Sequence, residues 1–313
     1  MLDLQEKPKL CSYKPIDGKY ILLTGGTGTF GQAFVKTILG NYEPALIRIF
    51  SRGEYLQWKT QGEFNDPRLD FFIGDIRDIS SIKKAMQGID IVVHAAALKQ
   101  ADLSESCPDE FIKTNVLGAI NLIDVATESF VDRVIAISSD KACAPNNAYG
   151  ATKMLMEKLF IAANLRNVAR FSCVRYGNVI GSRGSLTERY QKESKKGLIH
   201  ILDENITKFW WSVYDGVKFF IKCLEIMEGG EIFVPKMKSR RLLDVIDEID
   251  STSPRKIVGL RPGDKLHEEL ISPSEALHSM DLGDYYVIRP QLPIVLKNIG
   301  KPLPKDFRYT SEI

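Results

Sequence analysis

The sequence has no apolar run approaching the roughly 20 residues that a bilayer-spanning helix requires, so we expect no membrane-spanning segment. It also lacks an excess of one charge. Its 42 Lys and Arg nearly balance its 40 Asp and Glu, and this composition gives no reason to expect binding to nucleic acid or to a membrane. The first residues, MLDLQEKPKLCSYKP, contain no apolar core of the kind found in signal peptides.

Paired cysteines and clustered histidines are missing as well. The 5 cysteines are odd in number and show no CxxC spacing, and the 4 histidines are scattered along the chain. We therefore expect free thiols, a cytoplasmic location and no metal site. What the chain does have is length and apolar content, because 313 residues that are 44% hydrophobic can form a large core.

Short apolar segments alternate with stretches of helical pattern through the first 180 or so residues. Helices are expected near 31–39, 108–127 and 147–163. The expected strands are YILLT (20–24), LIRIF (46–50), FFI (71–73), IDIVVHA (89–95), RVIAIS (133–138) and FSCVRYG (171–177). This order predicts an α/β fold of Rossmann type, with a doubly wound parallel sheet and helices on both faces.

The alternation weakens after about residue 179. The charged run QKESKKG (191–197) predicts an exposed excursion, while EIFVP (231–235) and KIVGL (256–260) resemble strands. We expect three parts along the chain. They are an N-terminal arm over 1–18, a dinucleotide-binding Rossmann domain over 19–178, and, over 179–313, mostly a smaller α/β substrate-binding lobe with some segments returning to the Rossmann domain.

A glycine-rich turn, TGGTGTFG (24–31), follows the first expected strand and opens the first expected helix. Gly25, Gly28 and Gly31 permit a tight turn and close approach of a pyrophosphate, and the helix N-terminus offers free N–H groups. An ordinary strand-to-helix turn is the alternative. The order of strand, turn and helix favours nucleotide binding.

The second expected strand ends in Phe50-Ser51-Arg52, where NAD-binding proteins place an acid for the ribose hydroxyls. A guanidinium suits a 2′-phosphate, so Arg52 predicts NADP, although Glu54 is close enough in sequence to reach a ribose. Asp75 follows the third strand and is placed either to accept from the adenine amino group or to cap a helix.

Tyr149 and Lys153 form a YxxxK pair on an expected helix, so their side chains lie on one face. An ammonium beside a phenol lowers the pKa of the phenol, and a phenolate can remove a hydroxyl proton while hydride leaves the same carbon. Ser139, ten positions before Tyr149, ends the fifth strand and can bond that hydroxyl. The combination with the glycine turn is far more specific than YxxxK alone.

With these motifs the chain resembles the extended short-chain dehydrogenase/reductase family from residue 19 to about 290. A closer resemblance is to the inverting UDP-N-acetylglucosamine 4,6-dehydratases, which start pseudaminic acid synthesis. The segments that carry it are EFNDPRLDFFIGDIRD (63–78), HAAALKQ (94–100), SDKACAPNNAYGATK (139–153), RYGNVIGSRGS (175–185), GGEIFVPK (229–236) and RPGDKLHEEL (261–270).

The resemblance implies that C4 of the sugar is oxidised with Tyr149, Lys153 and Ser139. It further implies that Lys141 removes the C5 proton and that Asp140 is the acid that helps the C6 hydroxyl leave as water. A lysine base must be neutral, and we expect burial, Lys153 and the nicotinamide charge to lower its pKa. The alternative for Asp140 and Lys141 is an ion pair on a surface loop.

For the substrate, a UDP-sugar, the resemblance implies a diphosphate contact from Arg261 and a ribose or uracil contact from Glu268. Further substrate contacts are expected from Lys99, Asn178, Ser182, Arg183 and Lys208. Together with Tyr149 and Lys153, the residues expected to bind NADP are Gly25, Thr27, Gly28, Thr29, Phe30, Gly31, Ser51, Arg52, Asp75, Ile76, Ala95, Ala96, Ala97, Lys99 and Asn115.

Several positions depart from the family pattern. Ser139 stands where the family has Thr, Lys208 where it has Arg, and Asp264 where it has Glu. Lys208 lacks the planar guanidinium with which an arginine can bond an anion through two parallel N–H groups. The stretch 185–197 is less apolar than in relatives, which leaves substrate choice and assembly open.

Two other functions stay open. One is a UDP-sugar 4-epimerase or a capsule-pathway 4,6-dehydratase of the same group, although Asp140-Lys141 argues against a simple epimerase. The other is an NADP-binding sensor or scaffold without turnover, which would have no need for Ser139, Tyr149 and Lys153. The resemblance also implies a homo-oligomer.

Overall fold

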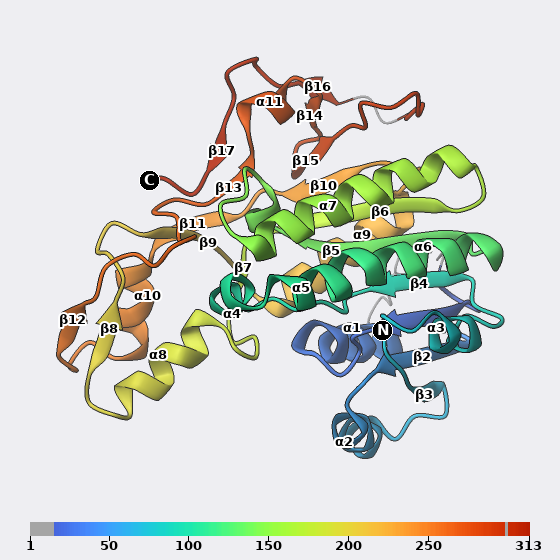
Figure 1. Ribbon diagram of the computed structural model, residues 1–313, viewed down its shortest axis with the longest axis horizontal. Coiled ribbons are helices and arrows are strands. Elements are labelled where there is room, and N and C mark those ends of the chain that lie inside the picture. The colour runs from blue at the N-terminus through green and yellow to red at the C-terminus, as the bar shows by residue number, and fades with distance from the viewer. Residues whose placement is uncertain (1–15, 298–299) are drawn as a thin grey trace, which may run out of the picture.

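The structure, a computed structural model, describes residues 16–297 and 300–313 (Figure 1). Most of the expected N-terminal arm lies outside the described residues. Every strand expected in the first 180 residues is present, because each is a short segment rich in β-branched and aromatic side chains. The parallel strands are β1 (Tyr20–Thr24), β2 (Leu46–Ser51), β3 (Leu69–Ile73), β4 (Ile91–His94), β5 (Arg133–Ser139), β6 (Arg170–Tyr176) and β10 (Ile232–Pro235).

The main sheet has the strand order β16-β14-β15-β10-β6-β5-β4-β1-β2-β3. The run β3-β2-β1-β4-β5-β6 is the doubly wound order of Rossmann folds, in which ligands bind beyond the carboxyl ends of the strands. At the far edge, antiparallel strands extend the sheet: β15 (Tyr285–Ile288), β14 (Ser279–Asp281) and β16 (Lys301–Pro302).

Helices cover both faces of this sheet (Figure 1). One face packs against α3 (Ile79–Ala85), α6 (Gly118–Glu128) and α7 (Ala148–Ala163), and the other against α1 (Thr29–Asn41) and α9 (Val213–Ile226). The remaining helical segments around the sheet are α2 (Glu54–Phe64), α4 (Ala101–Ser106), α5 (Pro108–Phe111), the π-helical η1 (Ile112–Leu117), the short 3₁₀ turns η2 (Asp140–Ala142) and η3 (Asn164–Arg166), and α11 (Pro273–Ala276).

A smaller α/β lobe lies beyond the carboxyl ends of the strands, to the left in Figure 1. Its separate core includes Tyr190, Trp210 and Leu242. The lobe contains α8 (Leu186–Ser194), β8 (Ile199–Ile201), α10 (Leu242–Ile249) and β12 (Arg255–Ile257). Between lobe and sheet lie β7 (Asn178–Val179), β9 (Thr207–Trp211), β11 (Lys238–Arg241), β13 (Glu269–Ile271) and β17 (Tyr309–Thr310).

Three details bear on the pattern expected after residue 179. The charged run 191–197 is not an open excursion in its first half, because it completes α8, whose N-terminus is capped by Ser185 accepting from the Glu188 amide. The EIFVP strand, β10, pairs with β6 and is thus one of the segments after residue 179 that return to the main sheet. The KIVGL strand begins one residue early and ends at Ile257. Within the described residues, no helix combines the length and apolarity needed to span a membrane.

Candidate active site

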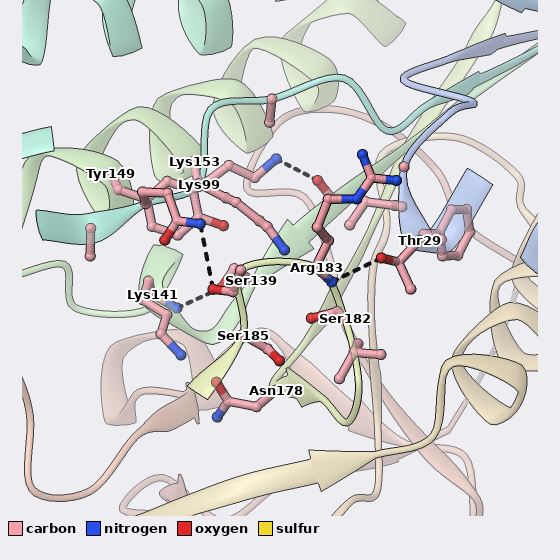
Figure 2. A pocket seen from close by; sticks show the side chains of 18 of the residues that line it. Thr29, Lys99, Ser139, Lys141, Tyr149, Lys153, Asn178, Ser182, Arg183 and Ser185 are labelled. Carbon is pink, nitrogen blue, oxygen red and sulfur yellow. Dashed lines mark hydrogen bonds between the residues drawn. The ribbon is translucent and has the colours of Figure 1, made fainter. Parts of the chain in front are cut away.

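A cavity of about 920 Å³ extends from the carboxyl ends of the parallel strands to the lobe. Its volume suits a site for small molecules or cofactors. Figure 2 shows Ser139, Lys141 and Tyr149 on one side of it and Thr29 and Arg183 on the other. It is lined by the predicted residues Gly25, Thr27, Gly28, Thr29, Phe30, Gly31, Ser51, Arg52, Asp75, Ile76, Ala95, Ala96, Ala97, Lys99, Ser139, Lys141, Tyr149, Lys153, Asn178, Ser182, Arg183, Lys208, Arg261 and Glu268.

The glycine turn forms a cradle that side chains would fill. Gly25 has φ +70°, and a Cβ there would lie 2.8 Å from the backbone of Ala95 and Ala96. Gly28 precedes α1, and no side chain caps the N-terminus of this helix. Its first amides therefore face the cavity as an anion site, which fits the pyrophosphate of a dinucleotide.

At the end of β2, Ser51 is fixed by Thr27 and Gln57, whose donors lie 3.3 and 3.0 Å from its hydroxyl. The Arg52 guanidinium projects into the cavity mouth with about half of its surface exposed, 3.8 Å from Asp75. No acid occupies the end of this strand. A cation at this position suits a phosphorylated ribose better than a free diol.

Asp75 does not cap a helix, because Asp78 caps α3 by accepting from the Ser80 amide. Asp75 instead pairs with Arg77 at 2.7 Å. Burial raises the pKa of Asp75, but the hydrogen bonds and charge of Arg77 outweigh this and hold the pKa below its usual value. Both of its oxygens, which lie at the cavity wall, already accept hydrogen bonds from Arg77.

Tyr149 and Lys153 both line the cavity from α7, but burial outweighs the charges that would lower the pKa of the phenol. The Lys153 ammonium donates to the Ile137 carbonyl at 2.5 Å and contacts the Met156 sulfur at 3.2 Å. Burial lowers the pKa of Lys153 to about 8. Burial also raises the pKa of Tyr149, against the opposing effects of a hydrogen bond with Ser139 and the charge of Lys141. The expectation that Lys153 lowers the pKa of Tyr149 is therefore wrong.

Ser139, Asp140 and Lys141 occupy the turn from β5 into η2. Asp140 is fully buried and does not line the cavity. Its Oδ1 accepts from Ser139 Oγ at 2.9 Å and lies 2.8 Å from Lys141 Nζ, while its Oδ2 has no hydrogen-bond partner within residues 16–297 and 300–313. These contacts make Asp140 a buried support of the two residues that face the cavity.

Two carboxylates face the Lys141 ammonium. Asp140 lies behind it, and Glu268 Oε1 lies 3.5 Å from Nζ. Desolvation lowers the pKa of Lys141, but the two carboxylates outweigh it and raise this pKa. The expectation of a lowered pKa for Lys141 is thus wrong, because the approach of Glu268 to Lys141 depends on how the chain folds and not on local sequence.

Glu268 and Lys208, both expected to contact substrate, form a buried ion pair of 2.5 Å. Lys208 Nζ also donates to the Lys265 carbonyl at 3.2 Å. Arg261 is likewise engaged, since it pairs with Asp264 at 2.9 Å and with Asp102 on α4. The cavity wall of the lobe is therefore built from cations that are already neutralised by carboxylates.

Arg183 lies over the glycine turn rather than deep in the lobe. Its amide donates to Thr29 Oγ1 at 3.0 Å, and its guanidinium donates to the Thr27 carbonyl at 3.1 Å. Lys99 lies nearby, and burial together with the charge of Arg183 lowers its pKa. These two cations face the end of the cavity where a pyrophosphate would lie.

Asn115 is a predicted cofactor residue that does not line the cavity. Its amide holds the loop after β4 by bonding the Leu98 backbone at 2.8 and 2.9 Å and Thr152 at 3.0 Å. In the π-helical turn η1, its neighbour Thr114 lines the cavity, and the buried Thr114 hydroxyl has no hydrogen-bond partner in the part of the chain that the structure describes. Such single π turns occur often at functional sites, but nothing in the sequence pattern indicates one here.

Further lining residues were missed by sequence reasoning, among them Asp102, Tyr176, Arg189 and Trp210. Tyr176 could have been noticed, since it ends β6 at the ligand edge of the sheet. Trp210 could not, because its place beside the cavity depends on how β9 packs in the lobe core.

The fold and the site define an extended short-chain dehydrogenase/reductase, with the Rossmann-type sheet, the glycine cradle and the Ser139, Tyr149 and Lys153 set in one cavity. A family model described as polysaccharide biosynthesis protein matches residues 21–290, and the chain belongs to this family.

Individual relatives are similar over most of their length. The chain is 45% identical to a UDP-N-acetylglucosamine 4,6-dehydratase (inverting) of Campylobacter jejuni subsp. jejuni serotype O:2, covering 94% of this chain and 92% of the relative. It is 42% identical to a UDP-glucose 4-epimerase of Rickettsia conorii, covering 86% and 82%. The crystal structure of Pen from Bacillus thuringiensis superposes with a TM-score of 0.89 at 33% identity, covering 95% and 93%.

Proposed function

We propose that the protein is a C5-inverting UDP-N-acetylglucosamine 4,6-dehydratase that works with bound NADP. The observation that carries this proposal is the position of Lys141 beside Ser139 and Tyr149 in one cavity, with Asp140 buried behind it. Oxidation and reduction at C4 require only Ser139, Tyr149 and Lys153. A second amine and carboxyl at the same place add the acid–base pair that elimination of water needs. The similarity to the Campylobacter relative supports the same choice.

The glycine cradle, the uncapped α1 and Arg52 fit a phosphorylated dinucleotide. When bound, its nicotinamide would accept hydride from C4 and later return it to C6. Tyr149 takes the proton of the C4 hydroxyl, and Ser139 orients that hydroxyl. The resulting 4-ketone acidifies the C5 proton, which Lys141 removes.

Asp140 is proposed as the acid for the departing C6 hydroxyl. Burial raises the pKa of its carboxyl, against the opposing charge of Lys141. Its contacts with the cavity pass through Ser139 Oγ and Lys141 Nζ. Return of a proton to C5 from the opposite face completes the inversion, and the product is a UDP-4-keto-6-deoxy-L-AltNAc-type sugar.

Residues 19–178 are proposed to bind the cofactor and most of 179–313 the sugar nucleotide, with β10 and α9 returning to the main sheet. We further propose a cytoplasmic homo-oligomer.

A UDP-sugar 4-epimerase is the second candidate, favoured by the 42% identity to the Rickettsia relative. The test is incubation with UDP-N-acetylglucosamine in deuterated water, followed by NMR of the sugar. A 4-keto-6-deoxy product with inverted C5 supports the dehydratase, and a C4 epimer identifies the second candidate. No conversion despite tight NADP binding identifies a sensor or scaffold.

Lys141→Ala tests the role of the base. We expect it to abolish water elimination, measured as the 4-keto product, while NADP binding stays unchanged because Lys141 is not among the residues proposed to hold NADP. Loss of NADP binding in this variant would contradict the assignment.

A further inference from the structure

Glu268 Oε1 lies close to two ammonium groups, accepting a hydrogen bond from Lys208 and forming an ion pair with Lys141. Lys208 Nζ lies 2.5 Å and Lys141 Nζ 3.5 Å from this one oxygen. All three side chains line the cavity, and those of Lys208 and Glu268 are less than one-tenth exposed. The second oxygen, Oε2, is buried and has no hydrogen-bond partner among the described residues. The carboxylate charge is therefore divided between two lysines that compete for it.

The backbone holds this arrangement in place from three elements. Lys208 comes from β9, and Glu268 directly precedes β13. The hydroxyl of Ser311, which is fully buried, accepts from the Glu268 amide at 2.8 Å and donates to the Thr207 carbonyl at 2.9 Å. Ser311, which directly follows β17, thus joins the backbone of Glu268 to that of Thr207, the neighbour of Lys208. These two bonds set the distance between Lys208 and Glu268.

We propose that Lys208 is a positioning residue that, by sharing Glu268 with Lys141, limits how strongly Lys141 holds its proton. This inference rests on the proposed role of Lys141 as the C5 base. Without Lys208, Glu268 would serve Lys141 alone, and the like-charge repulsion between the two ammoniums would disappear. Both changes stabilise protonated Lys141. A base held in that form cannot accept the C5 proton.

The charges around Glu268 agree with such sharing. Burial raises its pKa, but the charges of Lys141 and Lys208 outweigh burial and lower the pKa to about 2. Glu268 thus stays ionised through the working pH range, so the division of its charge between the two lysines persists.

Other charged groups on the elements packed against Lys141 are engaged elsewhere. Its own turn contributes Asp140, and α7 contributes Tyr149, both of which favour the protonated lysine. The further groups with their partners are Lys153 with the Ile137 carbonyl, Lys265 with the Cys143 and Ala144 carbonyls, Arg175 with Glu157 and Glu275, and Glu269 with Arg308. Among the described residues, Lys208 is therefore the cation in direct contact with the carboxylate that faces Lys141, while Lys265 acts on Glu268 through its charge alone.

The test measures the protonation of Lys141 directly, with the full-length protein and without turnover. Trace acylation with acetic anhydride at a series of pH values, followed by mass spectrometry, gives the midpoint at which Lys141 becomes reactive. The variants are Lys208→Met, Glu268→Gln and, as the charge-retaining control, Lys208→Arg. Circular dichroism and thermal melting identify any variant that does not fold.

We expect the midpoint to rise by about one pH unit or more in Lys208→Met and to fall by a similar amount in Glu268→Gln, the scale of one nearby charge. Lys208→Arg should stay near the wild-type value. The midpoints of the three variants should follow the same order when they are taken from the pH dependence of C5 proton exchange in deuterated water. Equal midpoints in all folded variants, or shifts of the same sign in Lys208→Met and Glu268→Gln, would overturn the inference.

The two proposals fail separately. If the wild-type protein does not convert UDP-N-acetylglucosamine but the midpoints shift as expected, the dehydratase function falls and the charge sharing stands. If conversion occurs while the midpoints do not move, the positioning role of Lys208 falls. Should Lys208→Met not fold, Lys208→Gln removes the same charge with a polar side chain, and the same rise of the midpoint is expected; an unchanged midpoint in that folded variant would overturn the inference.

Discussion

Gly150 on α7 lies directly against the backbone carbonyl of Lys141, with no room for a methyl group between them. This contact sets how closely the turn bearing Lys141 approaches the helix bearing Tyr149. Gly150→Ala should push the two apart, lower stability by about 1–3 kcal/mol, and reduce kcat by up to about a hundredfold through misplacement of the base. Urea unfolding and the dehydration assay measure both effects.

The matched control is Gly62→Ala on α2, where an added Cβ meets no atom within 4 Å. Because alanine is the better helix former, this variant should keep full activity and gain up to about 1 kcal/mol. Undiminished activity in a folded Gly150→Ala protein would show that the spacing between turn and helix is unimportant.

Arg183 closes over the glycine turn through its bonds to Thr27 and Thr29. Arg183→Ala removes a cation from the proposed pyrophosphate site and should weaken NADP binding by about ten- to a hundredfold, as expected for loss of a charged hydrogen bond. Fluorescence titration of the purified protein measures the Kd. Lys192→Ala, a change at an exposed side chain of α8, serves as control and should leave the Kd unchanged.

Arg52 should determine the choice between the two nicotinamide dinucleotides. Arg52→Ala is expected to raise the Kd for NADP by about tenfold or more and to leave the Kd for NAD nearly unchanged, because only NADP carries the 2′-phosphate. Competition titrations of the wild-type protein and the variant give the ratio of the Kd for NAD to the Kd for NADP. Tighter binding of NAD than of NADP by the wild-type protein would refute the assignment.

Glu275 and Glu157 hold the buried guanidinium of Arg175 at 2.8 and 2.7 Å. Burial raises the pKa of Glu275, but Arg175 outweighs it and lowers the pKa from 4.5 to about 2. The carboxylate therefore contributes stability that is complete above pH 4.5 and is lost as the pH falls toward 2.

Glu275→Gln should accordingly cost about 1–3 kcal/mol in the free energy of unfolding at pH 7, a value reduced for the partial exposure of this side chain. The difference from wild type should shrink steadily below pH 4.5, as followed by urea unfolding at several pH values. Glu248→Gln, at an exposed ion pair with Arg240, is the control and should change stability little at any pH. A Glu275→Gln deficit that persists at pH 2.5 would contradict the pKa assignment.

Much of the Rossmann-type half follows from local sequence. The β1 and β6 segments form strands because their buried side chains are of the types that favour strands. The glycine turn at 24–31 adopts its shape because only glycine tolerates the close approach of the Ala95 and Ala96 backbone at Gly25. The YxxxK pair likewise needs only helical spacing to bring Tyr149 and Lys153 to one cavity.

The lobe was harder to predict, since its parts are short and its pairings distant. β10 resembles any buried strand, and nothing local indicates that it pairs with β6 rather than within the lobe. α8 was missed because its charged residues give a weak apolar pattern, while its N-terminus depends on Ser185.

By itself, the sequence determined which chemical groups the protein carries and the order of the strands, turns and helices that bear most of them. Only the tertiary structure decided their protonation, because charge depends on which groups face one another across long sequence separations. Glu268 reaches Lys141, and Lys208 reaches Glu268, only after the lobe folds against the sheet and Ser311 fixes the strands between them. Burial and ion pairing then set the proton affinities, and neither can be obtained from spacing along the chain.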